Sequence, residues 1–460
     1  MARLNKKREP IHTHEGAKAK HINPELQLKR SVMSYLLWER EFYEDGEIIA
    51  DRIKSIIPHV NPQKVAEIAI EARSDMKLRH VPLLIAREMA RLGSHKKYVS
   101  DVLAEIIQRP DELTEFLAIY WKDKRQPLSK QLKLGLARAF PKFNEYSLAK
   151  YNKGGEIKLR DVLFLCHAKP KDKEQDALWK RLIDGTLAVP DTWEVGLSGG
   201  GDKKEVFERL LKKNKLGALA LLRNLRNMEG ARVDENIIID ALNRMKVERV
   251  LPFRFISAAR YAPQLEPQLE KAMLKCLSTH ESIRGHTVLL LDVSGSMEQG
   301  VSSKSDITRL DAACGVAMLL REICEKVTIF TFSMKLFKVP PRHGFALRDA
   351  IVTSQEHSGT PLGEAVKCVY ADRNYIIKEM RFTYSAYAVS YQGQGLMPDR
   401  LIVITDEQSC DSVPDPQGKG YMINVASARN GVGYGAWIHI DGWSEAVINY
   451  VIELEKVGFE

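Results

Sequence analysis

The stretch Thr287-Val288-Leu289-Leu290-Leu291-Asp292-Val293-Ser294-Gly295-Ser296 decides the fold of the C-terminal part of this chain. Its apolar run predicts a buried strand, and polar residues begin where that strand ends. Downstream, buried strands alternate with helices, which is typical of a doubly wound α/β domain with a parallel sheet. The segments predicted to form it are 286–291, 327–332, 401–405 and 436–440 as strands, and 310–325, 362–370 and 443–454 as helices.

Oxygen-bearing side chains follow three separate segments of this predicted sheet. They are Asp292, Ser294 and Ser296 after the first strand, Thr360 in the loop before the helix 362–370, and Asp406 after the strand 401–405. Because open α/β sheets bind ligands at the carboxyl ends of their strands, we expect these side chains to converge. Hard oxygen donors favour Mg²⁺, with Mn²⁺ or Ca²⁺ as alternatives, over Zn²⁺ or copper. The competing interpretation is that Asp292 and its serines only cap a strand–helix turn.

The pattern upstream of residue 281 is helical throughout. Short amphipathic segments, separated by Pro, Gly or polar turns, predict an α-helical domain of stacked HEAT-like repeats. The segments include 62–73, 129–139, 159–166 and 253–261. We therefore expect a basic disordered arm at 1–24, a helical-repeat domain at 25–284 and an α/β domain at 285–460.

Charge divides the chain at the same place. Residues 1–280 carry 52 Lys and Arg against 38 Asp and Glu, whereas residues 281–460 carry 17 against 22. A basic helical part joined to an acidic domain suggests that the helical part binds a polyanion. A solvated, lysine-rich surface is the alternative explanation.

The overall composition bounds the class of protein. A chain of 460 residues with 44% hydrophobic and 28% charged residues is typical of a multidomain globular protein, not of a disordered or fibrous one. No apolar run approaches the ~18 residues that a membrane helix needs, and no apolar segment follows the charged N-terminus. Six scattered cysteines form no Cys-x-x-Cys pair, which favours a reducing, cytoplasmic location over a disulfide or zinc framework.

The three oxygen-donor segments resemble, in order, the metal-ion-dependent adhesion site of the von Willebrand factor A domain. The resemblance implies that Asp292, Ser294, Ser296 and Thr360 hold the cation, with Asp406 reaching it through water. It also implies an open coordination position that accepts an acidic side chain from a partner. Glu407 departs from this pattern, because a further carboxylate facing the ion would alter the local charge.

Stretches of the helical part resemble the TROVE module of Ro autoantigen-type proteins. They are Lys158-Leu159-Arg160-Asp161-Val162-Leu163-Phe164-Leu165-Cys166-His167-Ala168-Lys169-Pro170, Leu219-Ala220-Leu221-Leu222-Arg223-Asn224-Leu225 and Leu251-Pro252-Phe253-Arg254-Phe255. The resemblance covers about residues 25–460 and implies a monomeric ring of helical repeats whose ends the A domain bridges. Such proteins bind small structured Y RNAs on the outside of the ring and the 3′ ends of misfolded noncoding RNAs in its central hole. The implied function is noncoding-RNA quality control or stability, with an exoribonuclease as a possible tethered partner.

The candidate RNA-binding residues lie mainly around His167, whose ring can stack on a base or donate to a phosphate. Six cations surround it within 22 positions: Lys150, Lys153, Lys158, Arg160, Lys169 and Lys171. The resemblance carries an outer RNA surface over to His167 and Lys169. A second basic helix face comprises Lys130, Lys133 and Arg138, and we expect it to face the ring or its hole. The alternatives are a helix-end histidine bonded to a backbone carbonyl and lysines that are merely solvated.

Two alternative functions belong to other classes. One is a protein-interaction scaffold whose metal site docks an acidic partner, and the other is a metal-dependent nuclease. The sequence contains neither a phosphate-binding Gly-x-x-x-x-Gly-Lys-Ser/Thr loop nor a His/Cys zinc set, and no general base stands out. We therefore expect an RNA-binding protein without enzymatic activity.

Overall fold

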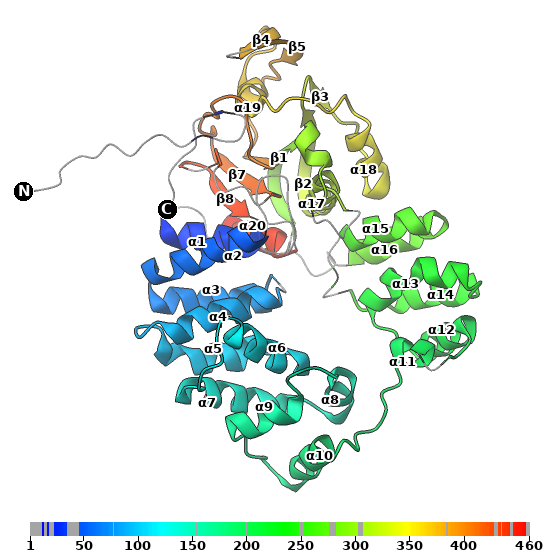
Figure 1. Ribbon diagram of the computed structural model, residues 1–460. Coiled ribbons are helices and arrows are strands. Elements are labelled where there is room, and N and C mark those ends of the chain that lie inside the picture. The colour runs from blue at the N-terminus through cyan, green and yellow to red at the C-terminus, as the bar shows by residue number, and fades with distance from the viewer. Residues whose placement is uncertain are drawn as a thin grey trace, which may run out of the picture.

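The structure is a computed structural model in which a helical part and an α/β domain follow one another along the chain (Figure 1). It describes residues 12, 16–17, 23–34, 46–76, 78–152, 154–198, 200–247, 250, 253–275, 282–301, 307–382, 385–426, 431–433, 435–441 and 445–456. Most of the predicted disordered arm lies outside these residues. Ala17, within that arm, is buried against the sheet of the α/β domain.

The helical part forms two successive arms of short helices. The first arm comprises α1 (Pro24–Ser34), α2 (Gly46–Ile56), α3 (Pro62–Ser74), α4 (His80–Arg91), α5 (Val99–Ile106), α6 (Pro110–Trp121), α7 (Lys130–Ala139), α8 (Glu145–Tyr151), α9 (Leu159–Cys166) and α10 (Lys173–Asp184). The second comprises α11 (Trp193–Ser198), α12 (Lys203–Lys212), α13 (Ala218–Gly230), α14 (Glu235–Arg244), α15 (Phe253–Tyr261) and α16 (Glu266–Leu274). The predicted helical repeats are therefore confirmed.

Local capping explains where these short helices begin and end. The Asp172 carboxylate accepts from the Gln175 N–H at 2.8 Å and starts α10, which ends at Gly185 with a φ of +72°. The Ser129 hydroxyl accepts from the Leu132 N–H at the start of α7. At α9, the Asp161 carboxylate accepts from the backbone N–H of Lys158 at 2.8 Å.

The α/β domain contains one six-stranded sheet and a separate hairpin. Its elements are β1 (Ile283–Asp292), α17 (Arg309–Ile323), β2 (Cys324–Phe332), β3 (Leu336–Lys338), α18 (Gly344–Val352), α19 (Leu362–Tyr370), β4 (Ile376–Phe382), β5 (Ser385–Gln392), β6 (Arg400–Thr405), β7 (Lys419–Asn424), β8 (Ile438–Asp441) and α20 (Glu445–Lys456). The strand order is β3-β2-β1-β6-β7-β8, and β4 pairs only with β5 in the hairpin. The sheet is parallel as predicted, except that the edge strand β3 runs antiparallel to β2.

Both faces of the sheet are buried, which explains the continuous apolar run of β1. Leu289 and Leu291 belong to a core shared with α17 and the second helical arm. Val288 and Leu290 point to the opposite core, which includes residues of α19. Alternate residues of one strand therefore serve opposite faces, and the strand needs no polar side.

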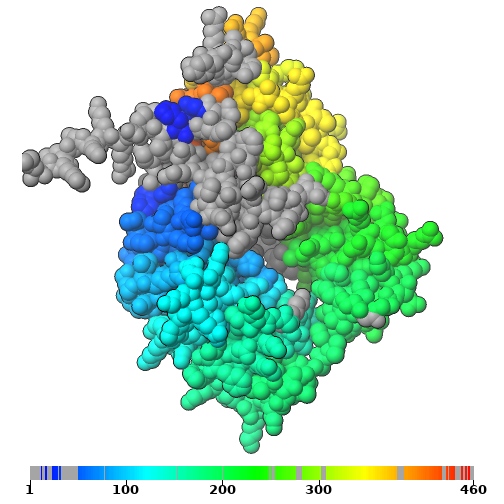
Figure 2. Space-filling view, viewed as in Figure 1, coloured from blue at the N-terminus to red at the C-terminus, as the bar shows by residue number. Residues whose placement is uncertain are grey.

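The α/β domain closes the two helical arms into a ring. Helix α1 contacts β8, whereas α15 contacts α17 and α16 contacts α18. At the second junction Arg260 pairs with Asp311, and the Glu270 carboxylate accepts from the Phe345 N–H at 2.7 Å. The space-filling view shows the arms descending from the α/β domain and meeting again below it (Figure 2). Among the described helices, none is long and apolar enough to cross a membrane.

Candidate functional site

The predicted metal ligands meet at the carboxyl edge of the central strands. Asp292 ends β1, and its two carboxylate oxygens accept from the Ser294 N–H at 2.8 Å and from the Thr405 hydroxyl at 2.6 Å. The hydroxyl oxygens of Ser294 and Ser296 lie 3.2 Å apart. The Asp292 side chain is thus held in place by β6 and by the loop that carries the serines.

Backbone hydrogen bonds bring Thr360 to the same edge. The Gly295 N–H donates to the Ser358 carbonyl at 2.9 Å, and the Cys410 N–H donates to the Thr360 carbonyl at 3.1 Å. The loop before α19 therefore lies between the loops that follow β1 and β6. Asp292, Ser294, Thr360 and Asp406 are buried, whereas Ser296 is partly exposed.

The electrostatics of this edge suit a divalent cation. Burial raises the pKa of Asp292, and the neighbouring Asp406 carboxylate raises it further. Two buried carboxylates beside three hydroxyls offer hard oxygen donors and a negative charge that a cation would neutralise. Within the described residues no group of three His, Cys, Asp or Glu side chains is placed to hold a metal. Binding of a divalent cation at this edge would therefore depend on the hydroxyls as well as on the carboxylates.

One cationic side chain at this edge was not predicted. Arg309, 1% exposed at the start of α17, donates from Nη1 to Asp406 Oδ2 at 3.2 Å and to the Ser296 carbonyl at 3.4 Å. These contacts offset part of the negative charge at the edge. The sequence offers no signal for them, since the Arg309–Asp406 pair joins residues that are 97 positions apart.

Glu407 is oriented toward β8. It occupies the left-handed region with a φ of +59°, and its Oε1 accepts from the Gly433 N–H at 3.1 Å. The same oxygen lies 2.7 Å from Nε2 of His439. Glu407, which departs from the adhesion-site pattern, thus forms a buried pair with His439 beside the candidate metal edge.

The predicted RNA-binding residues lie on three consecutive helices of the first arm. Lys130, Lys133 and Arg138 belong to α7, and Lys150 belongs to α8. Lys158 and Arg160 lie at the start of α9, whereas His167, Lys169 and Lys171 follow its end. Because α9 spans eight residues, about 12 Å, its two basic ends are separate. Lys153 lies outside the described residues.

The structure brings two of these candidates together. Helices α7 and α9 are in contact, and Lys133 Nζ lies 3.5 Å from Nε2 of the exposed His167. His167 ends α9 with a φ of +55°, so the ring projects from a left-handed turn. The neighbouring Lys169 and Lys171 are exposed as well.

Other candidates already have acidic or aromatic neighbours. Arg138 pairs with Asp101 at 2.5 Å, and Arg160 lies 3.9 Å from the Asp161 carboxylate. Lys150 Nζ lies 5.7 Å from the centre of the Tyr151 ring. Lys171 likewise lies 3.8 Å from the Asp172 carboxylate. These cations are therefore less available to a phosphate than Lys169 is.

Residues 180–321 match the model of the TROVE domain, from α10 through β1 and α17. The fold is similar to the crystal structure of the Deinococcus radiodurans RO (RSR) protein. The TM-score is 0.58 at 17% identity, covering 95% of this chain and 100% of that one. Residues 180–321 therefore match a TROVE domain, and the chain as a whole has the Ro-type fold.

Curated relatives match a short segment of this chain. Telomerase protein component 1 of Mus musculus is 37% identical over 89 residues, and that of Rattus norvegicus is 36% identical over the same length. Each match covers 18% of this chain and spans only 3% of the relative's length. A TROVE domain implies RNA binding. The candidates from Lys130 to Lys171 precede the matched segment 180–321, so their individual roles stay predictions.

Proposed function

We propose that this TROVE-domain protein acts in noncoding-RNA quality control or stability. A small structured, Y-like RNA binds the outside of the ring, while the 3′ ends of misfolded noncoding RNAs enter its centre. The proposed RNA-binding surface is supported by one observation, the proximity of Lys133 to His167. The exposed Lys169 and Lys171 follow His167 in the chain. Cations and a stackable ring on one surface suit a folded RNA, whose phosphates and unpaired bases are both accessible.

The proposal is tested by titrating a labelled, structured small RNA against the full chain at several salt concentrations. Phosphate neutralisation predicts that log K falls by about 0.7–0.9 per contact for each unit of log salt. Sequencing of the RNA that co-purifies with the chain would identify the natural ligand. An RNA affinity that is independent of salt would contradict the proposed surface. Cleavage of the RNA in the presence of Mg²⁺ would instead favour a nuclease.

The metal edge of the α/β domain supports an additional role. In this proposal a divalent cation, Mg²⁺ in the first instance, is held by Asp292, Ser294, Ser296 and Thr360, with Asp406 acting through water. The bound cation would coordinate an acidic side chain of a partner protein, such as a tethered exoribonuclease. The residues themselves orient the donors: Thr405 fixes Asp292, and Arg309 holds Asp406.

The same edge favours the alternative of a protein-interaction scaffold that needs no RNA. Capture of an acidic protein that depends on the metal and persists after nuclease treatment would support it. The unpaired, buried Cys166, Cys314, Cys324 and Cys368 are consistent with the cytoplasmic location that we propose for either role.

A further inference from the structure

The two helical arms meet at a junction that the hydrophobic core does not cross. The core of the first arm extends to Leu182, and the core shared by the second arm and the sheet begins at Val206. In between, Leu187 packs against the first core, whereas Trp193 packs against the second. The ring therefore contains a seam at residues 185–192, between α10 and α11.

Polar contacts hold this seam from both sides. On the first arm, Arg181 pairs with Glu145 of α8 at 2.9 Å, and Glu145 also accepts from the Ala188 N–H at 3.4 Å. On the second arm, Asp191 accepts from Arg209 and from Lys215, each at 2.8 Å. The two clusters together carry three cations against two carboxylates, which leaves one net positive charge.

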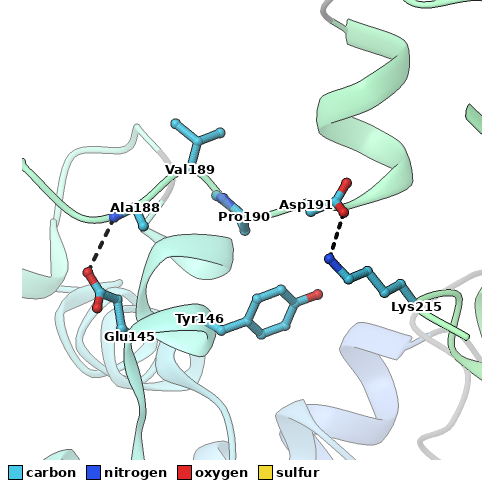
Figure 3. A pocket seen from close by; sticks show the side chains of 7 residues that line it. All are labelled: Glu145, Tyr146, Ala188, Val189, Pro190, Asp191 and Lys215. Atoms are coloured by element: carbon cyan, nitrogen blue, oxygen red, sulfur yellow. Dashed lines mark hydrogen bonds and ion pairs between the residues drawn. The ribbon is translucent and has the colours of Figure 1, made fainter. Parts of the chain in front are cut away.

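A cavity of about 530 Å³ lies at the seam. Its lining residues are Glu145, Tyr146, Ala188, Val189, Pro190, Asp191 and Lys215. Figure 3 shows the Tyr146 ring extending across the cavity below Pro190, with its hydroxyl directed toward Lys215. Tyr146 is 49% exposed, so about half of its side chain is open to solvent at this point.

We propose that this cavity is a binding site for a nucleotide of single-stranded RNA. The base stacks on Tyr146 against Pro190, and Lys215 binds the adjoining phosphate. Stacking on an aromatic ring beside a cation is the usual means of holding single-stranded nucleic acid, and it tolerates any base. The size of the cavity lies within the range of small-ligand sites, about 300–1,000 Å³.

The charges at the seam allow this binding without leaving a carboxylate unpaired. Arg209 Nη1 lies 2.8 and 2.9 Å from the two oxygens of Asp191, so Lys215 can turn to a phosphate while Asp191 keeps a partner. Both oxygens of Glu145 are bound by Arg181 at 3.0 and 2.9 Å, which reduces their repulsion of the RNA. A nucleotide placed here would contact both arms and link them across the seam.

The proposal rests on the RNA binding proposed above, but its test is separate. The probe is a fluorescein-labelled decamer of oligoadenylate, titrated against the full chain by anisotropy. We expect Tyr146→Ala to weaken binding by about 5- to 100-fold, and Tyr146→Phe, which keeps the ring, to stay within about twofold of the wild type. Lys215→Gln should reduce the slope of log K against log salt by about 0.7. Tyr375→Ala, which removes a 39% exposed ring from the α/β domain, is the matched control.

A second measurement locates the contact directly. Ultraviolet crosslinking of a decamer that contains 4-thiouridine, followed by mass spectrometry, should modify Tyr146 or the peptide at 188–191. Unchanged decamer affinity in Tyr146→Ala, with structured RNA still bound, would overturn this site and leave the proposed function standing. A wild-type chain that binds neither RNA would overturn both.

Discussion

The candidate metal edge of the α/β domain buries most of its oxygen donors and ties them together by hydrogen bonds. The basic surface of α7–α9, in contrast, exposes its side chains at separate points. Asp292 is held by Ser294 and Thr405 before any ligand arrives. On the helices, His167 and Lys169 are exposed at the end of α9, where His167 lies beside Lys133. A preorganised site should fail on a single substitution, while a distributed surface should weaken in steps.

The largest effect is expected where the donors are few and fixed. Asp292→Asn keeps the shape of the side chain but removes one of the two carboxylates, and we expect Mg²⁺ affinity to fall by at least about 100-fold, or ~2.7 kcal/mol. Because burial beside Asp406 disfavours the ionised Asp292, the metal-free variant should melt no lower than the wild type. Calorimetric titration with Mg²⁺ and Mn²⁺ measures the first effect, and a thermal melt measures the second.

RNA affinity provides the control for that variant. Structured RNA should bind Asp292→Asn within about twofold of the wild type, because the basic surface lies on helices of the first arm. If the wild type and the variant bound Mg²⁺ equally well, the metal site would be rejected, and Asp292 and its serines would only cap a strand–helix turn. A parallel loss of RNA affinity would show that the two sites are coupled, contrary to the comparison.

A smaller effect is expected when several cations are removed together. Replacing Lys158, Arg160 and Lys169 by Gln should weaken structured-RNA binding by about 5- to 20-fold and lower the salt slope by up to about two. Mg²⁺ affinity should not change. A filter-binding titration at three salt concentrations checks both values, and an unchanged affinity would place the RNA surface elsewhere on the ring.

His167 tests whether a ring contributes more than a charge does. His167→Asn suits the left-handed backbone, since Asn adopts a positive φ more readily than most residues, yet it removes the stacking ring. We expect structured-RNA affinity to fall about three- to tenfold while the free energy of unfolding changes by less than about 0.5 kcal/mol. Anisotropy and urea unfolding measure the two. A large loss of stability would mean that His167 stabilises the end of α9 and does not act in RNA binding alone.

The contrast between the two regions also explains what the sequence could predict. Predicted bounds agreed with α9 and α15, because apolar spacing and Asp161 define α9 locally. The candidate metal ligands can be picked out from the sequence because each follows its own strand or precedes its own helix. Neither the β4–β5 hairpin nor β7 was predicted, since their segments lack a continuous apolar run.

Contacts between distant segments could not be inferred in the same way. Arg309 reaches Asp406 only after the sheet has formed. The seam at 185–192 is defined by the boundary between two separate hydrophobic cores, which depends on the packing of distant helices. The same limit applies to Lys133 and His167, which lie 34 positions apart and meet because α7 packs on α9. Local pattern predicts an element, whereas a partner depends on the tertiary packing.

The smallest effect is expected at Arg138. Its substitution tests which of the predicted cations contact RNA. Its guanidinium pairs with the exposed Asp101, so an incoming phosphate would have to displace a carboxylate to reach it. Arg138→Gln should therefore change structured-RNA affinity by less than about twofold. Exposed ion pairs contribute about 0–1 kcal/mol, so stability should change little as well. Lys133→Gln, on the same helix but beside His167, is the matched comparison and should cost several fold. Equal losses in the two variants would mean that α7 contacts RNA along its whole face rather than at its junction with α9.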